Sequence, residues 1–319
     1  MCEKCVNTDM NIPITQSKKW QKLQENLGEI SHFESTDDYQ FLAIEKHTKA
    51  GNYLFLPYGP VAETKEGFKK AISKLESIAK ESNAIFIRIE PMLPEFAKIL
   101  PKNSKKTKDI EPAETWILDL PQQENGQAVS PALKSLLPSR LYRYYKNREK
   151  QGITVETSHN PEDIKYLLKL QKALATKKGI TTFTENYLKT ELEQSFATLY
   201  LLKKDHNILA AGLVFDDEET KTRYNLQGAQ SEEGRPLHAT GILTIQLILD
   251  AVNKGYKTFD FWGIAPEGAD KNHPWYGFTA FKKTFNGREQ KYAGTYDIIL
   301  NPTKYKLITA LKKLKKLIH

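Results

Sequence analysis

Two adjacent lysines, Lys282 and Lys283, lie within an aromatic segment at residues 275–285. This segment follows an apolar stretch at residues 258–264 and precedes another at residues 292–300. A lysine ammonium that is fixed beside a reacting carbonyl can stabilise the negative charge that develops on the carbonyl oxygen. Taken alone, a lysine pair on a helix is more typical of a solvated face whose aromatic neighbours pack in the core.

A second segment, residues 140–150, combines cations with aromatic rings. Cations can neutralise backbone phosphates while rings stack on bases, which suits single-stranded nucleic acid. An amphipathic helix with a solvated basic face is the alternative interpretation of the same residues. The cations are Arg140, Arg143, Lys146, Arg148 and Lys150, and the rings are Tyr142, Tyr144 and Tyr145.

The composition indicates a globular protein with two domains. The chain has 319 residues, whereas a single hydrophobic core usually stops growing at roughly 250–300 residues. With 39% hydrophobic and 27% charged residues, the chain can bury real cores and is not of a disordered type. The formal net charge of +8 favours anionic partners, although many basic proteins bind none.

The sequence lacks several features that define other classes of protein. No apolar run approaches the roughly 18–20 residues that span a bilayer, and the N-terminus has no signal-peptide core. A cytoplasmic location is therefore expected. No Gly-x-Ser-x-Gly elbow occurs and the histidines lack a recognisable nucleophile partner, so classical hydrolytic machinery is not indicated.

Cys2 and Cys5 form a single Cys-x-x-Cys pair. The pair supplies two of the four ligands that a structural zinc normally needs, and the sequence has no second such pair. A frayed terminal tail is expected rather than a metal or redox site, because chain ends are usually poorly ordered. We expect no metal and no other cofactor.

Apolar periodicity predicts a mixed α/β first half, a polar linker at residues 121–130 and a second cycle of helices and strands. In the first half, strands are expected at residues 41–45, 52–57, 84–89 and 115–120, helices at 66–82 and 94–100, and a basic loop at 102–108. In the second half, helices are expected at residues 131–150, 161–178, 184–196 and 238–253, and strands at 153–157, 199–202, 208–215, 222–227 and 259–262.

This order of elements resembles the N-acetyltransferase-like fold, present twice in tandem. In acetyltransferases of that fold, an Arg/Gln-x-x-Gly-x-Gly/Ala turn at a helix N-terminus cradles the pyrophosphate of coenzyme A. The corresponding loop here, residues 234–241, has glycines that do not fit this spacing. Coenzyme A is therefore not expected, and a different acyl donor is needed.

Three ordered motifs in the last third resemble the C-terminal signature of the FemABX peptidoglycan aminoacyltransferases. They are Tyr256-Lys-Thr-Phe-Asp-Phe-Trp-Gly-Ile264, Phe278-Thr-Ala-Phe-Lys-Lys-Thr-Phe285 and Asn301-Pro302. Residues 15–23 resemble the family's Gln-x-x-x-Trp opening, residues 53–61 its Tyr-x-Pro-x-Gly-Pro strand end, and residues 137–153 its basic helix. The resemblance covers most of the chain and indicates the compact form of the family, without an inserted helical hairpin.

The resemblance implies two tandem N-acetyltransferase-like (GNAT-type) α/β domains, with a C-terminal helix that returns to the first. Residues 1–120 and 293–319 would form the first domain, and residues 121–292 the second. The implied activity is that of a tRNA-dependent aminoacyltransferase, a monomer in the cytoplasm or at the inner membrane surface. It would carry an amino acid from aminoacyl-tRNA to the stem peptide of a peptidoglycan precursor, in cross-bridge formation.

By the same resemblance, Lys282 occupies the catalytic-site lysine position, where it would stabilise the tetrahedral intermediate or contact the terminal nucleotide of the tRNA. Phe281 would pack either the adenine or the core. Tyr187 would contact the nucleotide part of the precursor. Phe183 stands where the family's compact member has an arginine, and phenylalanine cannot bind a diphosphate bidentately. A lipid II-like precursor is therefore favoured over UDP-MurNAc-pentapeptide.

Other contacts with the substrates are also implied by resemblance. Trp20 and Lys22 would belong to the precursor site, with Lys22 meeting a phosphate or a stem carboxylate. Tyr224 would either face the precursor from a strand or lie in the core. The residues expected to bind the tRNA are Arg140, Arg143, Lys146 and Arg148.

Two other functions remain open. One is an N-acyltransferase of the same fold that uses coenzyme A or acts on another acceptor, such as a protein N-terminus. The other is a non-catalytic RNA- or membrane-binding relative, in which Lys282 would face solvent away from any cleft. A helix expected at residues 302–319 either covers the first domain or rests on an anionic membrane surface. Its apolar stripe comprises Leu307, Ala310, Leu311, Leu314, Leu317 and Ile318.

Overall fold

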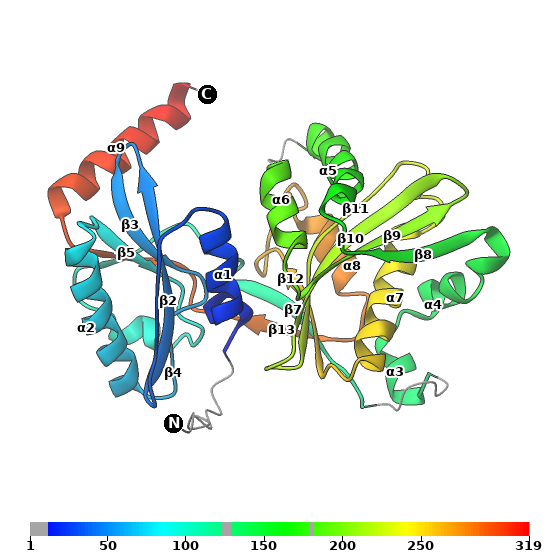
Figure 1. The fold of residues 1–319 in the computed structure, drawn as a ribbon, viewed down its shortest axis with the longest axis horizontal. Coiled ribbons are helices and arrows are strands. Elements are labelled where there is room, and N and C mark those ends of the chain that lie inside the picture. The colour runs from blue at the N-terminus through cyan, green and yellow to red at the C-terminus, as the bar shows by residue number, and fades with distance from the viewer. Residues whose placement is uncertain (1–11, 123–128, 179–181, 319) are drawn as a thin grey trace. The chain divides into compact units, whose positions relative to one another are not determined.

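The computed structural model of the protein describes residues 12–122, 129–178 and 182–318 (Figure 1). Its internal contacts divide the chain into two units. Met1–Ala113 and Lys291–His319 form the first unit, and Glu114–Gln290 forms the second. Cys2 and Cys5 lie outside the described residues, as does part of the expected linker.

The first unit is built around a mixed sheet in which the strands follow the order β1-β2-β3-β5-β14-β6, with β4 paired to β2. Neighbouring strands are antiparallel except β3 and β5, which are parallel. Because β14 lies near the end of the chain, it ties the C-terminal segment into this sheet. The strands are β1 Ser31–Ser35, β2 Tyr39–Thr48, β3 Gly51–Leu56, β4 Val61–Ala62, β5 Phe86–Ile89, β6 Ser104–Lys106 and β14 Tyr296–Ile299.

Helices cover both faces of this sheet, as the alternating side chains of β5 show. Ile87 and Ile89 pack in a core with α2, whereas Phe86 packs with Tyr305 and Ile308 of α9. A side-chain cap from Thr64 fixes the start of α2. The helices of this unit are η1 Ile14–Gln16, α1 Lys18–Asn26, α2 Lys65–Glu81, η2 Phe96–Ile99 and α9 Pro302–Ile318.

The second unit contains another mixed sheet, with the strand order β13-β7-β12-β11-β10-β9-β8. Strands β11 and β12 are parallel, whereas β7 with β12 and the run from β8 to β11 pair antiparallel. The strands are β7 Glu114–Asp119, β8 Ile153–Ser158, β9 Ala197–Lys204, β10 Asn207–Asp217, β11 Thr222–Gln230, β12 Thr258–Gly263 and β13 Arg288–Lys291.

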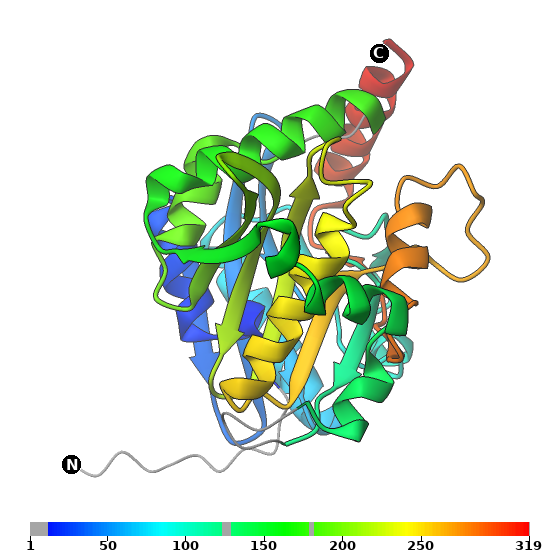
Figure 2. The ribbon, with the colours of Figure 1, turned by 90° about the vertical axis from the view of Figure 1, so that its right-hand side faces the viewer.

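One face of this second sheet carries α7, with α3 and α4 beside it (Figure 2). The opposite face is covered by α5 and α6, which contact β9, β10 and β11. The apolar side of α7 fills the core of the unit, and most residues of this helix are buried. The helices are α3 Pro131–Leu136, α4 Ser139–Lys146, η3 Glu149–Gln151, η4 Pro161–Asp163, α5 Ile164–Lys178, α6 Glu185–Leu192, α7 Ala239–Asn253 and α8 Tyr276–Lys282.

A buried ion network fixes α7 against the sheet. The Arg223 side chain is completely buried and donates to both carboxylate oxygens of Asp216, at 2.6 and 2.7 Å. It also donates to the Asp250 carboxylate at 2.8 Å and to the Leu247 carbonyl at 3.0 Å, both on α7. The network therefore joins β10 to β11 and α7, and the last two of these elements line the cavity described below.

The expected mixed α/β class is confirmed by the two sheets, whereas some element boundaries differ. The single helix predicted at residues 131–150 is wrong, because Leu137 is extended before Pro138 and separates α3 from α4. The basic loop expected at residues 102–108 contains β6. The expected first domain includes residues 114–120, whereas β7 pairs with β12 and lies in the second unit, and the expected second domain includes residues 291–292, which lie in the first unit.

Candidate functional site

The parallel strands β11 and β12 separate in the middle of the second sheet. Their pairing runs from Thr222 and Thr258 to Tyr224 and Asp260, where it ends. Beyond that point β11 continues to Gln230 along β10. The backbone and side chains of both strands can therefore line an opening beyond the last paired residues.

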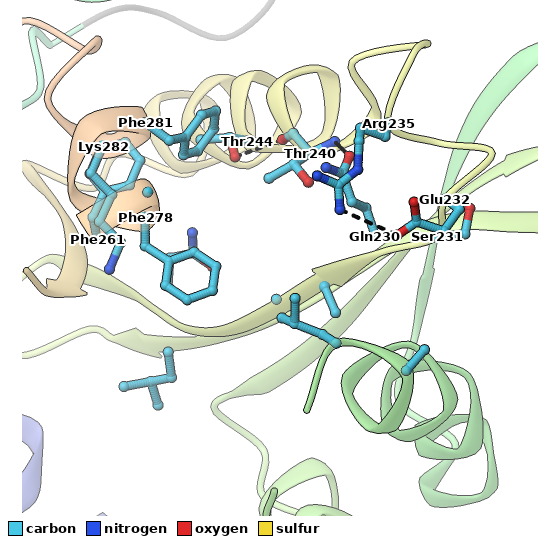
Figure 3. Close-up of a pocket in the computed structure, with 17 residues that line it drawn as sticks. Gln230, Ser231, Glu232, Arg235, Thr240, Thr244, Phe261, Phe278, Phe281 and Lys282 are labelled. Carbon is cyan, nitrogen blue, oxygen red and sulfur yellow. Dashed lines mark hydrogen bonds and ion pairs between the residues drawn. The ribbon is translucent and has the colours of Figure 1, made fainter. Parts of the chain in front are cut away.

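A cavity of about 490 Å³ occupies this opening (Figure 3). Its walls come from β11, β12, α5, α7 and α8. Phe261, Phe278 and Phe281 make one end aromatic, and Lys282 lies beside them. The size and the mostly apolar lining with a few polar groups are typical of a small-molecule site.

Helix α8 carries Lys282 as its last residue. The Lys282 ammonium donates to the carbonyl oxygen of Gly263, at the end of β12, at 2.5 Å. Lys283 is exposed instead and pairs with Glu289 at 3.3 Å. The Lys282 side chain therefore lines the cavity, whereas the Lys283 side chain lies at the surface.

A buried carboxylate lies close to this lysine. Asp260 on β12 is 3% exposed, and its Oδ1 accepts a hydrogen bond from the Trp262 amide at 2.7 Å. Burial lowers the pKa of Lys282 to about 8, while the Asp260 charge acts in the opposite direction. Burial also raises the pKa of Asp260 to about 6, against the Trp262 hydrogen bond and the Lys282 charge. A protonated lysine beside an ionised aspartate is thus the favoured state at neutral pH.

Phe281 takes part in both the cavity and the core. Its ring lines the cavity and meets Phe285 edge to face, with centroids 5.6 Å apart. Phe285 is fully buried and also contacts Phe261. The two roles that the sequence left open for Phe281 are therefore compatible in one position.

The end of the cavity away from Lys282 is polar (Figure 3). Gln230 Oε1 accepts a hydrogen bond from the Thr240 amide at 3.2 Å, at the start of α7. Arg235 donates to Glu232 at 3.3 Å in the preceding loop. Thr244 lies one turn along α7, between this polar end and the aromatic one.

The cavity does not include Tyr187 or Tyr224. Tyr224 is 7% exposed and packs edge to face against Trp262, so it lies in the core beside the site. Tyr187 is at the start of α6, where its ring stacks on Phe183 with centroids 4.9 Å apart. Phe183 is 52% exposed, so this position presents an aromatic pair rather than a cation.

The two expected precursor contacts near the N-terminus lie in the first unit. Both come from α1, whose N-cap Ser17 accepts a hydrogen bond from the Trp20 amide. Trp20 is buried, whereas Lys22 lies on the exposed side of the helix. The helix therefore offers Lys22, and not the Trp20 ring, to a ligand in solution.

The expected tRNA-binding cations lie on α4 or just beyond its end. Arg140, Arg143 and Lys146 are exposed on this helix, and Arg148 just beyond it lies over the Tyr145 ring at 4.1 Å. The apolar side of α4 packs on α7, where Leu141 occupies the space that a side chain at Gly241 would need. The basic face is therefore presented to solvent by a helix that is fixed to the core.

Gly234 in the loop before α7 and Gly241 in the first turn of α7 both have packing roles. A Cβ at Gly234 would approach the Leu209 carbonyl oxygen to 2.5 Å, and one at Gly241 would approach Leu141 to 2.7 Å. The absence of a side chain at these two positions thus permits close contacts within the protein. In the described part of the chain, no group of three or more His, Cys, Asp or Glu side chains could hold a metal ion.

Several residues of the site were not predicted from the sequence. The sequence does contain a sign that Asp260 is unusual, since it is a single carboxylate inside the apolar run Phe259 to Trp262. No sequence pattern marks Gln230, Arg235 and Thr240, because these residues meet only when the loop between β11 and α7 folds back on the strand. Among residues 12–122, 129–178 and 182–318, no helix is both long and apolar enough to cross a bilayer.

Comparison with known proteins gives similar sequences and similar folds. The model of the FemAB family matches residues 140–313. A lipid II:glycine glycyltransferase from Staphylococcus haemolyticus is 23% identical over 292 residues, and one from Staphylococcus aureus strain USA300 is 24% identical over 296 residues. Each alignment covers 91% of this chain and 62% of the relative, so the chain spans less than two thirds of the length of these relatives.

Solved structures share the fold. The crystal structure of FemX has a TM-score of 0.77 and 20% identity, covering 95% of this chain and 96% of that one. The structure of L-PGS from Bacillus licheniformis has a TM-score of 0.61 and 17% identity, covering 92% and 96%. At these identities the likeness concerns the arrangement of the elements and not the chemistry of the site.

Proposed function

The chain belongs to the FemAB family, and on that premise we propose that it transfers an amino acid from aminoacyl-tRNA to a stem-peptide amino group of a peptidoglycan precursor. The observation that carries the proposal is the position of Lys282, whose ammonium lies at the aromatic end of the cavity. The glycyltransferase relatives support a transfer reaction in cross-bridge formation.

The cavity suits the donor end of an aminoacyl-tRNA. Phe278 and Phe281 offer rings for the terminal base or for an amino acid side chain. The polar end at Gln230 and Arg235 lies farther from Lys282 and can receive the phosphates next to the terminal nucleotide, with the ribose between the two ends. In this arrangement the ester carbonyl would lie near the Lys282 ammonium.

Aminoacyl transfer requires no cofactor, because the ester is already activated. The amine attacks the carbonyl carbon, a C–N bond forms, and the C–O bond to the tRNA ribose breaks. The amine loses a proton and the ribose oxygen gains one. Lys282, with its pKa of about 8, is mostly protonated at neutral pH and would stabilise the oxyanion of the tetrahedral intermediate.

For the acceptor, a lipid-linked precursor is favoured over a UDP-linked one. Phe183 and Tyr187 form a stacked aromatic pair that cannot replace the charge and the two parallel hydrogen bonds of an arginine on diphosphate. Lys22 in the first unit is the proposed contact for a phosphate or a stem carboxylate. Trp20 supports that helix from its buried side, and Tyr224 supports Trp262.

We assign binding of the tRNA backbone to the exposed face of α4. Arg140, Arg143 and Lys146 provide its charges, and Arg148 extends the face beyond the helix. Since aminoacyl-tRNA is a cytoplasmic substrate, the reaction would take place in the cytoplasm, at the inner membrane surface when the acceptor is lipid-linked. The protein would act there as a monomer.

Mass spectrometry of the reaction products tests this function. Purified protein is incubated with a mixture of charged tRNAs and either lipid-linked or UDP-linked pentapeptide, with acetyl-coenzyme A as a separate donor. The expected result is a stem peptide that is heavier by one or more amino acid residues. No mass increase with any combination, while a known transferase works in parallel, would refute the proposal.

A further inference from the structure

Strand β12 contains one extra residue just before the site. Its pairing with β7 joins Asp260 to Ile117, and the next pair along the strands joins Gly263 to Thr115. Three steps along β12 thus correspond to two along β7, which defines a β-bulge. Bulges change the direction of a strand and its side chains, and they are frequent beside active sites.

The bulge depends on a residue with an unfavourable backbone conformation. Trp262 has φ of +63°, in the left-handed region that bulky residues rarely adopt. Its amide donates to Asp260 Oδ1 at 2.7 Å, so the aspartate holds the turn closed. The next carbonyl along the strand, that of Gly263, receives the hydrogen bond from Lys282.

Asp260 can therefore act on Lys282 in two ways, through the backbone of β12 and through its negative charge. On the first, the hydrogen bond to Trp262 directs the Gly263 carbonyl toward the ammonium. On the second, a buried negative charge favours the protonated form of the lysine. Lys282, Arg288 and the Thr115 hydroxyl on β7 also favour the ionised form of Asp260. On the neighbouring strands, Asp260 pairs with Ile117 of β7 and Tyr224 of β11.

We propose that Asp260 is the positioning residue of the site, which keeps Lys282 protonated and directed into the cavity. Its role as an aid to transfer rests on the proposed function, whereas its effect on Lys282 does not. Burial alone lowers the pKa of Lys282, and removal of the Asp260 charge lowers it further. Without the aspartate, a larger fraction of Lys282 would be neutral at pH 7 and unable to stabilise an oxyanion.

The charge can be separated from the hydrogen bond by substitution. Asp260→Asn retains an oxygen that accepts from the Trp262 amide but removes the charge, whereas Asp260→Ala removes both. Asp217→Asn is the matched control, because Asp217 is also buried and also closes a turn, accepting from Thr220 at 2.7 Å. Asp217 does not line the cavity.

The readout is the pH dependence of Lys282 acetylation by acetic anhydride, followed by peptide mass spectrometry without any substrate. The midpoint is expected at about 8 in the natural protein. It should fall by roughly one to three units in Asp260→Asn, the usual effect of a neighbouring opposite charge. It should stay unchanged in Asp217→Asn. An unchanged midpoint in Asp260→Asn, or an equal fall in the control, would overturn the proposal.

A reciprocal variant keeps the test decisive if Asp260→Asn does not fold. Lys282→Met removes the partner, so the pKa of Asp260, about 6 in the natural protein, should rise when it is followed by carboxyl NMR. No rise would contradict the proposed coupling. Neither the acetylation of Lys282 nor the titration of Asp260 requires aminoacyl transfer. Both measurements therefore test the coupling of the two residues even if the proposed function is wrong.

In the transfer assay, Asp260→Asn should shift the alkaline limb of the pH–rate profile to lower pH. At pH values below this limb, the transfer rate of the variant should differ much less from that of the natural protein. An effect that is equal at every pH would indicate a structural role only and would contradict the proposal.

Discussion

The ring of Tyr144 is stacked on the imidazole of His238, with centroids 4.2 Å apart and an interplanar angle of 19°. Tyr144 belongs to α4, and His238 immediately precedes α7. Arg140 and Arg143 both lie over the same tyrosine ring, at 5.7 and 5.9 Å. The stack therefore fixes the basic face of α4 next to the loop that forms the polar end of the cavity.

This arrangement predicts that the paired change Arg140→Ala with Arg143→Ala weakens tRNA binding. Each phosphate contact that is lost should reduce the slope of log affinity against log salt by roughly one. Fluorescence anisotropy with labelled tRNA at several salt concentrations measures this slope. The effect should be similar for all tRNA sequences, because phosphate contacts carry no sequence information.

The control for this prediction is a change of charge elsewhere. Lys65 and Lys69 are exposed on α2 in the first unit, and their paired replacement by alanine removes the same net charge. The slope should stay as in the natural protein. If both double variants reduce the slope equally, binding would follow net charge and α4 would have no special role.

The two adjacent lysines predict opposite kinetic results. Lys282→Met should lower the single-turnover transfer rate by roughly 10²–10³, the usual cost of losing an oxyanion-stabilising group, with tRNA affinity nearly unchanged. Lys283→Met should leave the rate within about threefold, because this exposed lysine pairs with Glu289 at the surface. Rapid-quench assays measure both rates. Equal losses in the two variants would contradict the assignment of Lys282.

Much of the fold could be predicted because local patterns decide its elements. The apolar spacing of α2, with its capping residue Thr64, and the apolar run of β12 are visible in the sequence. The strand β6 could not be found in this way, because its lysine-rich residues form a strand only by pairing with β14, almost 200 residues later in the chain. Long-range pairing of this kind leaves no local pattern.

The site could be predicted only in part. Lys282 and Phe281 stand in a recognisable motif, and both line the cavity. Whether a lysine faces the solvent or a cavity depends on where its helix packs, which the sequence of α8 does not contain. The role inferred for Asp260 depends on a bulge, and a bulge is a mismatch between two strands, β12 and β7, that are far apart in the chain.

The aromatic pair at the start of α6 predicts a change in acceptor preference. Phe183→Arg should increase the use of UDP-linked pentapeptide relative to the lipid-linked form, because an arginine can bind diphosphate bidentately. Phe183 is 52% exposed, so the longer side chain has room without repacking the core. Initial rates with the two acceptors measure the ratio. Phe183→Ala is the control, and an equal gain in that variant would show that only bulk had mattered.

A buried carboxyl predicts pH-dependent stability of the first unit. Glu90 is 2% exposed and accepts hydrogen bonds from Thr295 at 2.6 Å and from the Glu111 amide at 3.0 Å. Burial raises its pKa to about 7. Glu90 thus binds its proton more tightly in the folded state than in the unfolded state. Its contribution to the free energy of unfolding is full below pH 4.5, the pKa of the unfolded state, and is lost as the pH rises through about 7.

The variant Glu90→Gln mimics the protonated form and should remove this dependence. From pH 5 to pH 8 the natural protein should lose about 2.5 kcal/mol more than the variant, because most of the pKa shift from 4.5 to about 7 is titrated in this range and each unit corresponds to about 1.4 kcal/mol. Melting temperatures at the two pH values measure the difference. Parallel losses in both proteins would exclude Glu90 as the cause.

The ion network at Arg223 predicts a large loss of stability in the second unit. Arg223→Met should lower the free energy of unfolding by roughly 3–5 kcal/mol, because it leaves the carboxylates of Asp216 and Asp250 without their buried cation. Arg223→Lys should recover only part of the loss, since an ammonium cannot reproduce the paired hydrogen bonds to Asp216. Arg288→Met, which breaks the exposed pair with Asp119, should cost less than about 1 kcal/mol. Urea denaturation followed by circular dichroism measures all three, and similar costs for Arg223→Met and Arg288→Met would show that burial does not determine the strength of the network.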